Sequence, residues 1–474
     1  MKTAILELYN VQDVARRIVK QATKLGASEA EALVYARDDT VVRFSQNNIS
    51  QSAMYRDEGA MVRVFVAPSR RGIVFVKQLG DDEAIEKGIR RAISLASDVG
   101  ERKNAVPFTA AGKIPRSNSN FKRQTETTTA EISEKAAKFA INTSLGVSAL
   151  IKRVAGTITT RVANIAIQNS RGLDAYHKYP GASFVTVSLA KKENSTGVGF
   201  AAQASNNFAD IDIRSTSKEA ANDAIRSVKP QEINLGAYDV IFYPNAAFDW
   251  LGSFTQLGFS TQRMKGYVEA GKKCAAEKLT IVDDPTNPDT LMAIPFDAEG
   301  TPTSKLALVE DGIARALCFD NNSAAKAGVQ STAHSPFPND LTYESKFFPA
   351  WIYFPANQIV KPGTTSFDDM ISGSKKKTIL VKRFMYGGLP MCVSETEIMQ
   401  GYTMGTWLVE DGEIKHPLPS LRLSHSLSGL ANSIVDIGDD ESVKRLGCMN
   451  VPCMKVENVN FSVSTSMSVP QGVL

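Results

Sequence analysis

The stretch "GAMVRVFV" (residues 59–66), followed closely by "GIVFVKQL" (residues 72–79), decides the fold class of the N-terminal part of the chain. Val62, Val64 and Val66 alternate with the residues between them, which is the two-residue period of a half-buried β-strand. Two more strand-like runs come before it, "EALVYAR" (31–37) and "TVVRFSQ" (40–46). Strand-like runs this close together in the chain predict antiparallel strands.

Helical patterns flank these strands on both sides. Apolar side chains recur at helical spacing from Val11 to Leu25, and Gly26 ends the pattern. A second helix is predicted over about 83–97, with its apolar side chains on one face. The first hundred residues therefore predict a helix, antiparallel strands and a helix. This is an α+β unit rather than an alternating series of strands and helices, and we take 1–100 as one domain.

The rest of the chain predicts a central region and a C-terminal region. Residues 101–232 contain strand-like runs, a turn at "NSRG" (169–172) and predicted helices over about 129–143 and 215–228. The loop "KPQEINLG" (229–236) marks a domain boundary. Residues 233–474 are rich in strands and are punctuated by Gly, Pro and Asp, which is typical of a curved or barrel-like antiparallel sheet. The predicted class is α+β throughout.

Composition and charge limit the possible partners. The 474 residues are 43% hydrophobic and 22% charged, with a net charge of +4, so we expect an ordinary globular protein with no strong attraction to nucleic acid or membranes. The densest basic run is "SKKKTILVKR" (374–383). We interpret it as a solvated edge strand whose lysines prevent pairing with another chain. The alternative is a patch that binds nucleic acid.

Cysteine usage and hydropathy indicate the compartment. The five cysteines include no C-x-x-C pair and are widely scattered, which favours free thiols in a reducing environment. The N-terminal residues lack the pattern of a signal peptide, and no apolar run approaches the ~20 residues that span a bilayer. We therefore expect a soluble cytoplasmic protein.

Common catalytic motifs are missing from the sequence. The four histidines, at 177, 334, 416 and 425, are isolated from one another, and no His-Glu-x-x-His or Gly-x-Ser-x-Gly occurs. Asp283, Asp284, Asp297 and Glu299 could act as paired acids and bases. We interpret "DDPTNPD" (283–289) instead as a run in which Asp and Pro set turns.

Several stretches together resemble one known family. They are "LGASEAEALVYARDDTVVRFSQ" (25–46), "DEGAMVRVFV" (57–66), "LTIVDDPTNPDT" (279–290), "FDAEGTPTSKLALVEDGIARAL" (296–317) and "GTWLVEDGEIKHP" (405–417). In their order and spacing they resemble the TldD/PmbA family, also called modulator of DNA gyrase or the TldD/TldE metalloprotease group. The resemblance covers nearly the whole chain.

The resemblance draws attention to "WLGSFTQLGFSTQRMKG" (250–266). TldD-type members carry His-Glu-x-x-x-His on a helix in this interval, and a later Cys completes their metal site. PmbA/TldE-type members lack these ligands and pair with a TldD-type chain. Aligning the family's Gly-His with Gly258-Phe259 places Phe254 and Phe259 at the two histidine positions and Thr255 at the Glu position.

This replacement removes the metal chemistry. A phenyl ring has no lone pair for zinc, and a threonine hydroxyl is no general base near neutral pH. Five residues advance ~500° on an ideal helix, so side chains at 254 and 259 diverge by about 140°. We therefore predict apolar packing at this place. Cys448 and Cys453 lie where the family's third ligand is expected, but the simpler interpretation is that they are buried thiols.

The resemblance implies a PmbA/TldE-like subunit of a TldD/TldE-type metallopeptidase that acts on unfolded or extended peptides. The zinc would lie in a TldD-like partner. This chain would bind no cofactor and would contribute no catalytic or metal residue, so whether it is itself an enzyme stays open. One alternative is a homodimeric peptide-binding protein. Another is a metallopeptidase with unrecognised ligands, such as His425 with Cys448. The charge balance gives no support for DNA binding.

Overall fold

The structure, a computed structural model, describes residues 10–67, 69–99, 105–112, 114, 123–261, 267–291, 293–337, 355–385 and 397–465. Its N-terminal part is the predicted helix, strands and helix: α1 (Val11–Lys24), β1 (Glu29–Ser45), β2 (Asn48–Ala67), β3 (Arg70–Val76) and α2 (Asp82–Asp98). Helix α1 begins after Asn10, whose side chain accepts a hydrogen bond from the Gln12 N–H (3.0 Å). Gly26 follows its end with φ of 104°.

The central region continues with α3 (Arg123–Glu126), α4 (Ala130–Leu145), β4 (Ile151–Asn169), β5 (Asp174–Lys192), β6 (Ser195–Ser205), η1 (Phe208–Asp210) and α5 (Ile213–Arg226). Helices α4 and α5 lie within two residues of the predicted bounds. The predicted turn joins β4 to β5. There the Asn169 side chain accepts hydrogen bonds from the N–H groups of Arg171 (2.9 Å) and Leu173 (3.2 Å), and Gly172 has φ of 86°.

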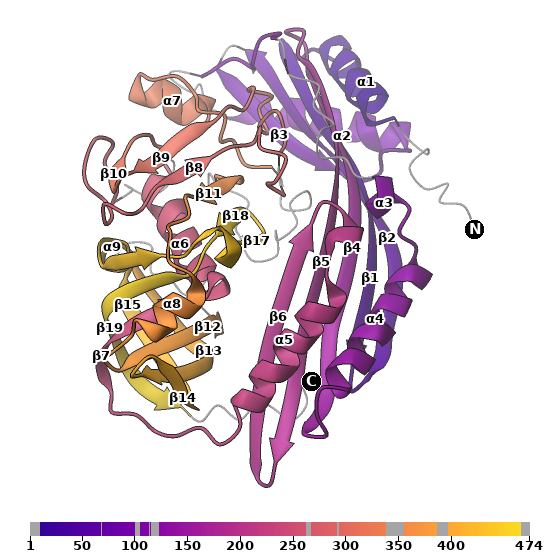
Figure 1. Ribbon diagram of the computed structural model, residues 1–474. Helices are drawn as coiled ribbons and strands as arrows, with labels where there is room; N and C mark the ends of the chain where they lie inside the picture. Colours follow the sequence, from indigo (N-terminus) through magenta and orange to yellow (C-terminus); the bar gives the residue numbers. More distant parts are fainter. Residues whose placement is uncertain are drawn as a thin grey trace.

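One sheet runs through both of these regions. Its strand order is β3-β2-β1-β4-β5-β6, and Glu31 on β1 pairs with Arg63 on β2 and with Asn169 on β4. The long strands curl into a half-barrel, drawn on the right of Figure 1. Helices α1, α2, α4 and α5 pack on one face of it. Its other face packs on Ile294, Phe296 and Ala298 of the C-terminal region.

The C-terminal region contains many short elements. They are β7 (Gly236–Phe242), α6 (Pro244–Phe259), β8 (Ile281–Asp283), β9 (Leu306–Glu310), β10 (Ile313–Ala314), α7 (Asn321–Ala327), β11 (Gln358–Val360), α8 (Phe367–Ser372), β12 (Thr378–Met385), β13 (Ile398–Glu410), β14 (Glu413–Pro417), β15 (Ser420–Ser426), α9 (Leu427–Asn432), β16 (Ile434–Ile437), η3 (Asp440–Ser442), β17 (Lys444–Leu446), β18 (Met449–Val451) and β19 (Met454–Thr465).

These strands form a barrel and a second sheet. The order β12-β7-β19-β15-β13, together with the pairing of β12 with β13, closes a five-stranded barrel. The predicted barrel-like sheet is thus confirmed, although β12 and β7 pair in parallel. The second sheet has the order β10-β9-β8-β11-β18-β17. Helix α6 contacts both sheets through β12 and β18, and its side chains belong to the largest core cluster.

The basic run 374–383 does not form the solvated strand edge that we predicted. Lys375 and its two lysine neighbours are exposed, but β12 is a strand of the barrel wall, paired with β7 on one side and with β13 on the other, and Lys382 is only 7% exposed. Its Nζ lies 2.6 Å from Glu219 Oε1 and 3.0 Å from Asp223 Oδ2. Both carboxylates belong to α5, so this lysine joins the half-barrel to the barrel. The partly buried Glu219 and the buried Asp223 are partners that the sequence alone did not reveal.

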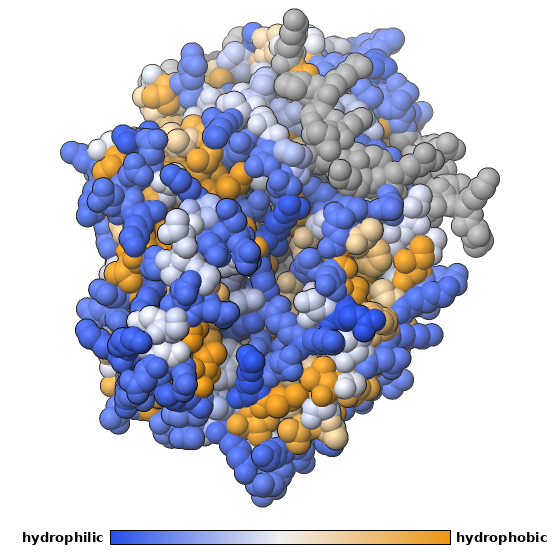
Figure 2. Space-filling view, in the orientation of Figure 1, coloured by the Kyte–Doolittle hydropathy of each residue, from blue (hydrophilic) through white to orange (hydrophobic). Residues whose placement is uncertain are grey.

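The surface in view is dominated by hydrophilic side chains, and the apolar ones form small separate groups (Figure 2). Within the described ranges, every helix is too short or too polar to cross a bilayer.

Candidate functional site

Helix α6 carries the stretch that the resemblance aligns with the family's metal motif. Pro244 occupies its first turn, where its missing N–H costs nothing. Nearly every residue from Trp250 to Phe259 is buried. The side chains of a helix that is buried on all sides must pack closely against their neighbours and leave few voids.

Phe254 and Phe259 lie against each other in this core. Both are 0% exposed, and their ring centroids are 5.9 Å apart with the planes at 72°, which is the favourable edge-to-face arrangement. Tyr267 contributes a third ring, 6.1 Å from Phe254, and its hydroxyl donates to the Phe254 carbonyl (3.0 Å). The rings do not diverge as the ideal-helix angle predicted. Phe259 is the last helical residue, so that angle does not fix where its ring lies.

Thr255 and Gly258 complete the aligned positions. The Thr255 hydroxyl donates to the Gly252 carbonyl (3.1 Å) within the helix. A Cβ at position 258 would lie 2.7 Å from Val268 Cγ2, so glycine lets residues 267 and 268 pack closely. None of these side chains presents a lone pair to a common point. The residues at the end of α6 therefore do not fit a zinc ion.

The structure separates the two candidate third-ligand cysteines. Cys448 is 6% exposed and belongs to the same core cluster as Phe254 and Phe259. Cys453 belongs to a different cluster, and its Sγ lies 3.7 Å from Met370 Sδ. Burial raises the pKa of the Cys453 thiol to about 11, which keeps it protonated. Of the two, only Cys448 shares a core with the aromatic pair.

The alternative ligand set gains no geometric support. His425 is partly buried, and its Nδ1 lies 3.1 Å from the Ser426 carbonyl oxygen. In the ranges that the structure describes, no three His, Cys, Asp or Glu side chains are arranged to hold a metal ion.

A polar cluster that the sequence did not reveal lies beside the aromatic pair. The Cys318 N–H donates to the Phe259 carbonyl (2.9 Å), and His334 Nε2 lies 3.4 Å from Asp283 Oδ2. His334 Nδ1 lies 2.6 Å from the Thr332 carbonyl oxygen. The Thr332 hydroxyl also lies 3.0 Å from Nδ1, so the tautomer of the ring decides which of these groups donates.

These contacts shift the pKa of the His334 ring. Burial by itself lowers the pKa of His334, but Cys318 and Asp283 more than offset burial and raise it well above its usual value. The contact between His334 and Asp283 joins the segment around 334 to β8 in the core. Cys318 and His334 looked isolated in the sequence, and Asp283 was considered only together with its neighbour Asp284, so only their proximity in the fold identifies the cluster.

Asp297 and Glu299 form a second buried acidic pair. Asp297 accepts hydrogen bonds from the N–H groups of Glu299, Thr301 and Ser335, each at 2.9 Å. It thus sets the turn that follows it. Burial raises the pKa of Asp297 to about 6. Burial raises the pKa of Glu299 to about 7, and the negative charge of Asp297 is the next largest contribution to this increase.

Family models match the chain in three consecutive parts. They are described as PmbA/TldA metallopeptidase domain 1 (residues 30–96), central domain (122–228) and C-terminal domain (235–463). A "Metalloprotease" of Methanothermobacter thermautotrophicus is 25% identical over 268 residues, 55% of this chain and 53% of the relative. "Metalloprotease PmbA" of Escherichia coli O157:H7 is 25% identical over 50% of each chain. The chain spans about half the length of these curated relatives.

Solved structures share the fold. A putative modulator of a DNA gyrase from Thermotoga maritima superposes with a TM-score of 0.82 at 21% identity, over 96% of this chain and 100% of that one. TldE from Thermococcus kodakarensis gives a TM-score of 0.81 at 20% identity, over 95% and 100%. The three family models, matched in order along most of the sequence, show that this chain belongs to the PmbA/TldD metallopeptidase family.

Proposed function

We propose that this chain is the metal-free subunit of a cytoplasmic metallopeptidase whose zinc lies in a TldD-like partner. The observation that carries the proposal is the buried edge-to-face pair Phe254–Phe259 at the end of α6. Two phenyl rings fill the space that imidazoles would need and offer zinc no ligand. A chain built this way contributes shape and partner surface rather than an activated water.

The substrate in this proposal is an unfolded or extended peptide. Strand β3 ends the described half-barrel sheet, and Ile73 and Phe75 on it are 44% and 54% exposed. An end strand offers main-chain donors and acceptors to an added strand, and exposed apolar side chains offer contacts to its side chains. These features support capture of a peptide through its backbone.

Co-purification from the native host tests the proposal. The chain should co-purify with a chain that carries His-Glu-x-x-x-His, and the pair should cleave an unfolded protein such as reduced casein. This chain alone should cleave nothing, and replacing the partner's histidines should abolish cleavage by the pair. Purification without such a partner, with peptide binding retained, would favour the homodimeric alternative. Cleavage by the pure single chain would contradict the proposal.

A further inference from the structure

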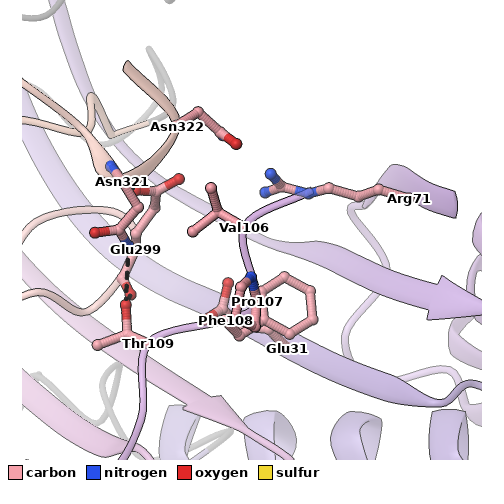
Figure 3. Close-up of a pocket in the computed structure, with 9 residues that line it drawn as sticks. All are labelled: Glu31, Arg71, Val106, Pro107, Phe108, Thr109, Glu299, Asn321 and Asn322. Atoms are coloured by element: carbon pink, nitrogen blue, oxygen red, sulfur yellow. Dashed lines mark hydrogen bonds between the residues drawn. The ribbon is translucent and has the colours of Figure 1, made fainter. Parts of the chain in front are cut away.

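The two ends of the half-barrel differ in how their charges are balanced. At the end next to the C-terminal region, a small pocket is lined by Glu31 of β1, Arg71 of β3, the loop 106–109, Glu299, and Asn321 and Asn322 of α7 (Figure 3). Its volume of about 10 Å³ leaves room for one water molecule. The positive charges of Arg63 and Arg71 act on Glu31, and that of Arg63 also acts on Glu299. Opposite charges therefore face each other at this end, and the pocket is too small for a larger ligand.

The other end of the half-barrel is formed by the β1–β2 hairpin, the start of β4 and the end of β5. Asn47 in the hairpin donates from Nδ2 to the Lys152 carbonyl (3.0 Å), and the Lys191 N–H donates to the Leu150 carbonyl (2.9 Å). The cations gathered here, which we call the basic end, are Arg43, Lys152, Arg153 and Lys191.

The basic end carries positive charge without counter-charge. All four side chains are exposed, and among the described residues none of them forms an ion pair. The next carboxylate along β5, Glu193, lies 2.9 Å from Lys229 Nζ and is thus already paired. A surface of this kind attracts negatively charged groups.

Three of these cations lie on the concave face of the half-barrel. Val42 and Phe44 on either side of Arg43, and Ala190 beside Lys191, belong to the core cluster under helices α4 and α5. Side chains alternate between the two faces of a strand, so Arg43 and Lys191 point to the opposite, concave face. Arg153 pairs with Leu189, which also adjoins Ala190, and it therefore shares the concave face.

Apolar side chains adjoin the cations on the same face. Leu189 lies between Arg153 of β4 and Val198 of β6, and Val187 precedes Leu189 by two residues on β5. Leu189, Val187 and Val198 are all partly exposed. The concave face at the basic end therefore offers positive charge and apolar contacts side by side.

The spacing of the three cations suits an extended chain. Arg43 pairs with Thr157, four residues along β4 from Arg153, and Lys191 lies two residues beyond Leu189. With about 3.4 Å per residue along a strand and about 4.8 Å between strands, the outermost Cα atoms are about 22 Å apart. An extended segment of about seven residues spans this distance.

We propose that the basic end binds an acidic stretch of an unfolded polypeptide. Carboxylates of the bound segment pair with Arg43, Arg153 and Lys191, and its apolar side chains contact the partly exposed residues of β5 and β6. This inference rests on the proposed function and adds to it a preference for acidic sequence, in a stretch of the substrate apart from the one that pairs with β3. A nucleic-acid backbone would match the cations but offers little to the apolar side chains beside them.

Two unstructured twelve-residue peptides test this inference. One carries three Glu residues among Val, Ser and Gly, the other carries Gln at those three positions, and both have a rhodamine at the carboxyl end. Fluorescence anisotropy on the pure full chain at pH 7.5 in 50 mM NaCl should show the Glu peptide binding about tenfold more tightly, the combined effect of three exposed ion pairs. This advantage should shrink to about threefold or less in 300 mM NaCl, because salt screens exposed charges.

A matched pair of double variants locates the effect. Arg153→Gln combined with Lys191→Gln should remove most of the advantage of the Glu peptide. Lys375→Gln combined with Lys376→Gln removes the same charge from the densest basic run of the sequence and should keep the advantage. All four positions are exposed, so both variants should fold.

The outcomes separate this inference from the subunit role. Equal affinity for both peptides, no binding of either, or an advantage that survives Arg153→Gln with Lys191→Gln would overturn the basic end and leave the subunit role intact, because that role requires only backbone capture. A twelve-nucleotide oligothymidylate that displaces the Glu peptide and binds more tightly would overturn it in favour of nucleic acid. Failure to find a TldD-like partner would overturn the subunit role without changing the peptide comparison.

Discussion

At the residue scale, the Phe254–Phe259 pair can be tested as packing. Phe254 is fully buried and contacts Phe259 and Tyr267. Phe254→Ala removes this contact and leaves a cavity, so it should lower the free energy of unfolding by about 3–5 kcal/mol in urea titrations. The control Phe75→Ala, at a position 54% exposed, should cost less than about 1 kcal/mol. Equal effects would show that the pair is not a core contact.

Glu299 gives the chain a pH dependence whose sign follows from its environment. Its folded pKa of about 7 lies above the ordinary 4.5, so the carboxyl group favours the folded state below pH 4.5. That contribution is lost as the pH rises through 7. Glu299→Gln should therefore match the wild type near pH 4.5 and be more stable at pH 8, by on the order of 1–3 kcal/mol.

Thermal melting from pH 4.5 to 8 measures this difference, and the exposed Glu457→Gln should leave the profile unchanged. Asp297, Arg63 and Asp320 act on the Glu299 charge, and Glu31 and Arg71 share its pocket. A Glu299→Gln variant that is less stable at pH 8 than the wild type would show that a partner satisfies the carboxylate.

At the element scale, the helices of the half-barrel approach its edge strands through glycine. A Cβ at Gly199 on β6 would lie 2.0 Å from the Ala220 carbonyl oxygen of α5. Gly199→Ala must push α5 off the sheet and should cost at least about 2 kcal/mol by urea unfolding. In the control Gly252→Ala the new Cβ meets nothing within 4 Å. That helical change should be neutral or stabilising by up to about 1 kcal/mol. Similar effects would refute the close approach.

The elements also show what could be predicted from the sequence. Helices α1, α2, α4 and α5 follow from local apolar spacing, so their bounds were close. The half-barrel depends on β1 pairing with β4, for example Glu31 with Asn169. No local pattern specifies a partner that far along the chain. The same holds for the barrel, in which β12 pairs with the distant β7.

The candidate site was predictable only in part for the same reason. The aligned positions in α6 came from a family resemblance, and the structure shows them as packed core. The Cys318–His334–Asp283 cluster and the partners of Lys382 went unrecognised, because residues brought together by folding look isolated in the sequence.

At the scale of the whole molecule, Lys382 joins the half-barrel to the barrel. Besides Glu219 and Asp223, its Nζ lies 3.7 Å from the centroid of the Tyr243 ring. Lys382→Met leaves two carboxylates without this partner and should cost about 3–5 kcal/mol. Differential scanning calorimetry should show a lower Tm. The exposed control Lys375→Met should change the stability by less than about 0.5 kcal/mol, and an equal shift in both variants would contradict the role of Lys382.

The zinc content of the purified single chain tests the account most directly. The chain is loaded with excess zinc, desalted and measured by atomic emission, alongside the complex with its TldD-like partner. The account predicts far less than one zinc per copy of this chain, and about one per partner in the complex. One zinc per copy of this chain alone would contradict it.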